Sequence, residues 1–222
     1  MRLPLSSSRR FAIRNINPYS APGPGGPIAL PDNRFDDMSS WIAGGQVGCN
    51  YEFQNRWVVG IEGSWSGSKL NEGITNLPMF PPPFIQTVTT DIKSIYTVTG
   101  RLGYSFLPNW LGYAKAGFAS ARIQTSGQTT PAIPGLVLDW NTALWHNGYV
   151  VGLGAEYMVT RNITVGVEYN YIGLGSVDHV GAVSGGGIGP ANQIVHGVTA
   201  NIQSVMARAN FLFGGGPIVA RY

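Results

Sequence analysis

From residue 41 onward, apolar and polar side chains alternate along the chain in seven segments. They are Trp41–Phe53, Arg56–Ser66, Ser94–Phe106, Trp110–Ile123, Gly148–Val159, Asn162–Leu174 and Ala200–Phe213. Successive side chains of a β-strand point to opposite faces, so a period of two predicts strands with one apolar and one polar face. In the sixth segment the apolar phase consists of Ile163, Val165, Val167, Tyr169 and Tyr171.

The connections between these segments have two lengths in strict alternation. Tight turns join Phe53 to Arg56, Phe106 to Trp110 and Val159 to Asn162. Long links rich in Pro, Gly, Ser, Thr and Asn lie between them: Gly67–Lys93, Gln124–Asn147 and Gly175–Thr199. Short turns at one end and long loops at the other predict an antiparallel up-and-down transmembrane β-barrel of the eight-stranded type, with the turns in the periplasm. A soluble β-sandwich gives no reason for this alternation.

Charged side chains within the segments fall on the polar phase. They are Glu52, Glu62, Arg101, Lys115, Glu156, Glu168 and Arg208. An Arg or Lys that faced lipid at mid-depth would cost about 2–4 kcal/mol, which explains the phasing. Buried charges are tolerable when they are paired, and an eight-stranded barrel is just wide enough for side chains to fill. We therefore expect these seven residues to form a structural ion-pair network that plugs the lumen; the alternative is a proton or ion path.

Composition agrees with a membrane barrel. Charged residues make up 11% of the 222 residues, where about 25% is typical, and no run of about 18 apolar residues exists, which excludes a transmembrane helix. Aromatic residues near the tight turns and the C-terminal end predict a periplasmic girdle. Its members are Tyr51, Phe53, Trp57, Tyr104, Phe106, Trp110, Tyr157, Phe211 and Phe213.

Residues 1–40 are expected to be an irregular N-terminal segment that precedes a barrel domain at 41–222, because prolines and glycines interrupt them. Seven strands are odd, whereas bacterial barrels have an even number, and the strand order implies that the first is absent. Either Arg10–Tyr19 is a degenerate first strand, or the sequence begins inside the first outer loop. No signal peptide is visible, and a truncated N-terminus would explain both absences, so we favour the second reading.

Four stretches of the chain are similar to a known family. They are WIAGGQVGCNYEFQNRWVVGIEGSW, TVTGRLGYSFLPNWLGYAKAGFASA, GYVVGLGAEYMVTRNITVGVEYNYIGLG and ARANFLFGGGPIVARY. In this order they resemble strands of the outer membrane protein β-barrel domain family, small OmpA-type barrels also labelled porin family or outer-membrane immunogenic proteins. The resemblance implies a location in the Gram-negative outer membrane, insertion by the barrel assembly machinery and a terminal aromatic, here Phe213 or Tyr222. It departs at the first strand, and the label porin does not transfer a pore.

No catalytic, cofactor or metal site is expected. His146, His179 and His196 fall in predicted outer loops without a hydroxyl arranged as in barrel deacylases, and Cys49 stands alone. The basic cluster Arg9, Arg10 and Arg14 is interpreted as a solvated tail, so no nucleic-acid partner is expected. The sequence favours a monomeric, non-enzymatic barrel, in contact with outer-membrane lipid, with a structural or surface-interaction role. The alternative is a small-solute channel, and a soluble carrier barrel is disfavoured by the apolar outer face.

Overall fold

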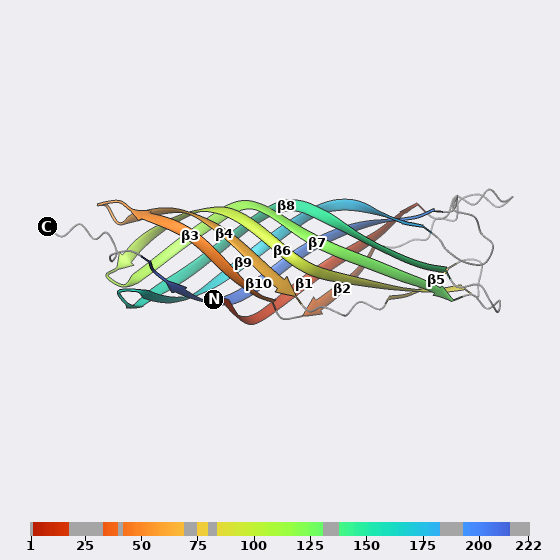
Figure 1. Cartoon of the computed structure of the whole chain (residues 1–222), viewed down its shortest axis with the longest axis horizontal. Coiled ribbons are helices and arrows are strands. Elements are labelled where there is room, and N and C mark those ends of the chain that lie inside the picture. The colour runs from red at the N-terminus through yellow and green to blue at the C-terminus, as the bar shows by residue number, and fades with distance from the viewer. Residues whose placement is uncertain are drawn as a thin grey trace.

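The computed structural model describes residues 2–17, 33–39, 42–68, 75–79, 84–130, 138–182 and 193–213. These residues form ten strands: β1 (Arg2–Asn17), β2 (Asn33–Ser39), β3 (Ile42–Glu52), β4 (Trp57–Ser68), β5 (Thr75–Met79), β6 (Phe84–Leu107), β7 (Trp110–Thr130), β8 (Leu138–Thr160), β9 (Ile163–Ala182) and β10 (Gln193–Phe211). Within these ranges no helix is long and apolar enough to cross a membrane. The strands run obliquely around one elongated barrel (Figure 1).

All strand pairings are antiparallel, and neighbours follow the order β10-β9-β8-β7-β6-β4-β3. β1 brings the two ends of this series together (Figure 1). One edge of β1 pairs with β10, from Arg2 opposite Arg208 to Asn17 opposite Val195. Its other edge pairs with β2 over Ser8–Arg14 and with β3 at Arg2 opposite Gly44. β2 and β3 therefore lie along β1 as two parts of one long strand, and the ring has the eight positions that the sequence predicts.

The N-terminal segment differs from the favoured expectation. The structure places strands at Arg2–Asn17 and Asn33–Ser39 inside the stretch expected to be irregular, and β1 occupies the position of the first strand. The alternative reading, a degenerate first strand at Arg10–Tyr19, overlaps β1 from Arg10 to Asn17; β1 begins eight residues earlier, and residues 18–19 lie outside the described ranges. Hydrogen bonding along β10 explains why a stretch with weak alternation is extended here, because a paired ladder satisfies backbone groups whatever the side chains are.

The seven predicted strands are all present, and the tight turns lie where they were expected. At the opposite end, β6 to β10 continue far beyond their predicted limits, so the long links are loops only in part. β6 has 24 residues and spans about 80 Å along its length, whereas a membrane-crossing strand needs about 9–11 residues. The residues of Thr87–Thr90 are Thr and Val, which favour strands. They lie in the stretch Gly67–Lys93, whose many polar residues, prolines and glycines predict a loop from the sequence alone.

The turn between β3 and β4 shows why one junction is so short. The Phe53 amide donates to the Trp57 carbonyl at 2.7 Å, and the Arg56 amide donates to the Phe53 carbonyl at 3.0 Å. Arg56 adopts a φ of 67°, in the left-handed region that closes such hairpins and that usually holds Gly or Asn. The turn fixes the register of β3 against β4, which places Gly48 opposite Glu62.

Side chains alternate in burial as the sequence predicts. Outward apolar residues are exposed, with Val47 at 78% and Leu153 at 64%, whereas the intervening positions of β6 to β10 are mostly buried or half-buried. The fourth predicted segment, Trp110–Ile123, follows the same rule: Ala114 and Phe118 are exposed, and Tyr113 and Lys115 are buried. An apolar surface of this kind is stable against lipid and costly in water, so the outer face is a membrane surface.

Candidate functional site

Six of the seven predicted lumen charges converge inside the barrel. Each comes from an inward position of a strand and is at most 7% exposed: Glu62 of β4, Arg101 of β6, Lys115 of β7, Glu156 of β8, Glu168 of β9 and Arg208 of β10. We refer to these six residues as the lumen cluster. Its three acids and three bases balance, so its formal net charge is zero.

Glu62 and Glu168 are the two most connected acids of the lumen cluster. Glu62 accepts from Lys115 at 3.3 Å, lies 4.0 Å from the Arg101 guanidinium and pairs with Arg208. Glu168 accepts from Lys115 at 2.8 Å and pairs with Arg208. Lys115 and Arg208 thus each bridge both carboxylates, so no single acid holds either base alone.

Glu156 holds the third part of the lumen cluster. Its carboxylate accepts from Arg101 Nη2 at 2.8 Å and lies 3.9 Å from Arg208 Nε. This contact matters because Arg101 and Lys115 are direct cross-strand partners, and like charges in that arrangement repel. The acids around them compensate this repulsion, as buried charges require.

Tyr113 of β7 is buried against the lumen cluster and bonds to two of its members. Its hydroxyl donates to Glu168 at 2.8 Å and accepts from Arg208 at 2.7 Å. The Arg101 guanidinium lies 3.8 Å from the centre of the Tyr113 ring, in a cation–π arrangement. Gly154 makes room for this ring, since a Cβ there would lie 2.4 Å from it.

Glu52 is the one predicted member that the structure places apart. It is the last residue of β3, is partly exposed, and makes no ion pair with the other charges whose side chains the structure describes. Register explains the difference: Gly48 lies opposite Glu62, so Glu52 is about 13 Å further along the strand, beside the turn. A side chain at that distance cannot reach the lumen cluster.

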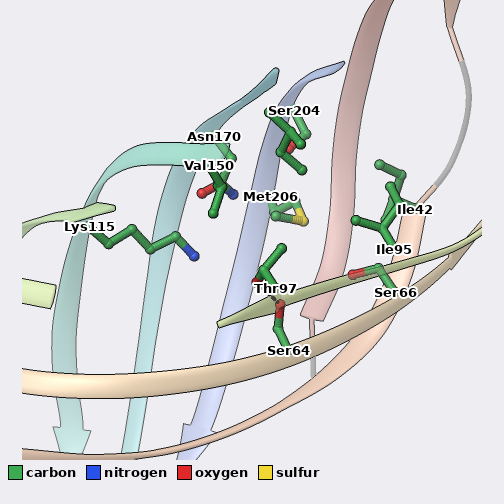
Figure 2. A pocket seen from close by; sticks show the side chains of 11 residues that line it. Ile42, Ser64, Ser66, Ile95, Thr97, Lys115, Val150, Asn170, Ser204 and Met206 are labelled. Carbon is green, nitrogen blue, oxygen red and sulfur yellow. Dashed lines mark hydrogen bonds between the residues drawn. The ribbon is translucent and has the colours of Figure 1, made fainter. Parts of the chain in front are cut away.

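A small cavity with a mixed polar and apolar lining lies next to the lumen cluster. Its volume is about 20 Å³, enough for a water molecule, and Lys115, Asn170, Ser64 and Thr97 are among its lining residues (Figure 2). Ser64 and Thr97 share a hydrogen bond of 2.6 Å. Asn170 donates to Glu168 at 2.8 Å, and its Oδ1 has no partner within the described part of the chain.

Beyond the cavity, the inward positions become mainly apolar, with the fully buried His146 and Thr125 among them. The sequence did not predict this second layer, because the alternating pattern assigns each strand one apolar outer face and one polar inner face along its whole length. Its side chains are all at most 6% exposed: Ile42, Ile92, Ile95, Ala119, Ala121, Ile123, Val150, Ile172, Leu174, Ala200 and Ile202. The signal was present in the sequence as apolar residues on both phases near the outer ends of the segments. The lumen therefore holds an ionic layer followed by an apolar layer.

The outer face carries aromatic contacts at two heights. Near the tight turns, ring contacts join Tyr51 to Phe53, Trp57 to Tyr104, Phe106 to Trp110, Trp110 to Tyr157 and Phe211 to Phe213. These are the residues of the expected girdle. A second set, Tyr96 with Trp145 and Tyr149 with Tyr171, lies higher on the barrel. Trp145 and Tyr157 both lie on β8, one in each aromatic set. For a strand tilted by about 45°, their heights along the barrel axis differ by about 28 Å, which is close to the height of about 25 Å of the apolar band in membrane barrels.

The sequence model of the outer membrane protein beta-barrel domain matches residues 16–207, most of the chain. The chain belongs to this family. The match includes five of the six residues of the lumen cluster, and the sixth, Arg208, lies one residue beyond the end of the match. Membership establishes an outer-membrane location, and the apolar band with its two aromatic sets agrees with it.

Named relatives agree with the family. The 31 kDa outer-membrane immunogenic protein of Brucella melitensis biotype 1 is 27% identical over 61% of this chain. The 22 kDa outer membrane protein of Rhizobium leguminosarum bv. viciae is 29% identical over 64%. The chain covers 54% and 58% of the length of these two relatives. Among solved structures, the attachment invasion locus protein Ail of Yersinia pestis matches 93% of this chain and 99% of its own, with 11% identity and a TM-score of 0.36.

The histidines are not in loops, contrary to expectation. His146 lies in β8 and is fully buried, with Nδ1 3.3 Å from the Gly175 carbonyl oxygen. His179 of β9 and His196 of β10 occupy opposite positions of the same ladder. The strands extend further than predicted, which accounts for all three. No group of three or more His, Cys, Asp or Glu side chains suited to a metal ion occurs in the described part of the chain.

Proposed function

We propose that this family member is a closed, non-conducting outer-membrane barrel that anchors an exposed surface structure. The observation that carries the proposal is the lumen cluster, in which six charged side chains and Tyr113 fill the interior at one level. A passing solute would have to displace ion pairs that are shielded from water. Breaking one such pair costs about 3–5 kcal/mol.

The apolar layer supports the same function by a different physical mechanism. Ions cross an apolar constriction poorly because it offers no replacement for their hydration shell. Ile92, Ile123 and Ile202 are each at most 1% exposed at this level. The cavity between the two layers has room for water, but a volume of about 20 Å³ is far smaller than a solute channel needs.

The surface role rests on the length of the strands. β6, β7, β8, β9 and β10 have between 19 and 24 residues, about twice what a membrane crossing needs. The excess lies at the end opposite the tight turns, which is the extracellular end in bacterial barrels. A wall projecting from the membrane presents side chains to partners outside the cell. A relative named an immunogenic protein agrees with a surface-exposed role.

We propose a monomer that the barrel assembly machinery inserts and that carries no catalytic activity. The ring of strands leaves β10 paired on both edges, by β9 and β1, so a second copy is not needed to complete the sheet. The carboxylates best shielded from solvent, Glu62, Glu156 and Glu168, are each held by at least two bases. A carboxylate fixed in this way is poorly available as a general acid or base.

Planar-bilayer recording tests the closed lumen. The purified full chain should give no steady open-channel current. Arg208→Ala removes a side chain that contacts all three acids and should introduce conductance, whereas Arg161→Gln in a tight turn should not. A large, steady current through the unaltered protein would refute the closed barrel and would favour the small-solute channel.

A further inference from the structure

The seven bases with described side chains fall into three groups. Arg101, Lys115 and Arg208 lie in the lumen, and Arg56 and Arg161 lie at the tight turns. The remaining two, Lys93 and Arg122, are exposed on the outside of the barrel wall. They are neighbours, although their positions in the sequence differ by 29, and neither belongs to the site described above.

The register of β6 against β7 brings these two cations together. Arg122 of β7 lies opposite Ser94 of β6, and Lys93 is the extra residue at the bulge between Ile92 and Ser94. Ile92 and Ile95 point inward and are nearly fully buried, so the bulge turns Lys93 to the outer face. Arg122 has buried neighbours on both sides, Ala121 and Ile123, and therefore also points outward.

The two cations lie at the boundary of the apolar band. Arg122 is directly opposite Trp145 of β8, and the Trp145 ring lies 5.8 Å from the ring of Tyr96. These rings belong to the higher aromatic set, at the level where aromatic side chains meet lipid headgroups. Below them, the outward residues of β6 are Val98 and Leu102, both more than half exposed. A bound lipid can thus place its acyl chains on this apolar wall and its polar groups at the cations.

Local charge favours an anion at this position. Asp91 lies 3.4 Å from Lys93, with side chains 15% and 48% exposed, so about half of the Lys93 side chain stays accessible to other ligands. Arg122 has no carboxylate partner among the described side chains. Two bases against one acid leave a net positive charge. The guanidinium of Arg122 suits a phosphate group, because it can donate two parallel hydrogen bonds to the phosphate oxygens.

We propose that Lys93 and Arg122 bind the phosphate groups of the phosphorylated glycolipid, lipid A, in the outer leaflet. Tyr96 and Trp145 support its sugar–acyl junction. The site depends on the membrane orientation of the barrel and not on a closed lumen. Each Lys or Arg near an anionic lipid surface contributes about fivefold in affinity, so loss of both weakens binding by about thirtyfold.

Native mass spectrometry of the folded full chain with diphosphorylated lipid A tests this site. Lys93→Gln with Arg122→Gln should lower the bound fraction to match the thirtyfold loss. Arg56→Gln with Arg161→Gln is the matched control, because it removes the same charge from the opposite end and should bind as the unaltered protein does. Lipid A stripped of its phosphates should bind the unaltered protein as weakly as it binds the double variant.

Three results would overturn the site. They are equal binding by the Lys93 and Arg122 variant, equal weakening by the control variant, and equal binding of phosphate-free lipid. Heat-modifiable migration in the same samples reports whether each chain is a folded barrel. An unaltered chain that shows no such shift would overturn the barrel itself and the site with it. A steady bilayer current would contradict only the closed lumen.

Discussion

Substitution of Glu168 by Gln tests whether the lumen cluster stabilises the barrel. Gln keeps the volume of the side chain but removes its charge, so the cluster changes from neutral to a net charge of +1. Lys115 at 2.8 Å and Arg208 both lose one of their acids, and the Tyr113 hydroxyl loses a charged acceptor. Removing one partner of a buried ion pair costs about 3–5 kcal/mol, largely because the remaining charge is left uncompensated.

Urea unfolding of the purified barrel in lipid vesicles, followed by tryptophan fluorescence, measures this cost. The free energy of unfolding should fall by about 3–5 kcal/mol for Glu168→Gln. Glu52→Gln is the control, because Glu52 lies outside the cluster and its loss should change stability by no more than about 0.5 kcal/mol. Glu168→Gln with Lys115→Met restores neutrality and should recover part of the loss, which a double-mutant cycle reports as coupling.

A loss below about 1 kcal/mol for Glu168→Gln would refute the reasoning, because that is the range of exposed ion pairs. An equal loss for Glu52→Gln would also contradict it. In that case the stability would depend on total charge rather than on the contacts of the lumen cluster.

Three further predictions concern the wall of the barrel. Gly154→Val should destabilise the barrel by about 1–3 kcal/mol in the same urea assay, because its Cβ would overlap the Tyr113 ring; Gly45→Val, with open space around it, should not. Val167→Arg, at an outward position 49% exposed, should cost about 2–4 kcal/mol in lipid, whereas Thr160→Arg beside a turn should cost less. Deletion of residues 2–17 removes the strand that joins β10 to β3 and should abolish heat-modifiable migration; retained migration would show that β1 does not close the ring.

The sequence alone determined where the membrane-crossing parts of seven strands lie, which face each residue there occupies, and that charged side chains point into the lumen. These properties are local: the side-chain period of a strand is fixed at two, and lipid excludes charge from one phase. Glu168 and Glu52 look alike on this criterion, since both are acids on the polar phase. The local pattern also predicted the tight turns, because hairpins close over a few adjacent residues.

Only the tertiary structure decided which inward residues meet. The height of a residue in the barrel depends on the stagger between strands, which non-local pairing fixes. Stagger brings Glu168 to Lys115 and Arg208 and leaves Glu52 near the turn. It also places Lys93 beside Arg122. The extension of the strands and the position of β1 also could not be read from the sequence. Hydrogen bonds to a neighbouring strand can hold a polar or weakly alternating stretch in a strand conformation.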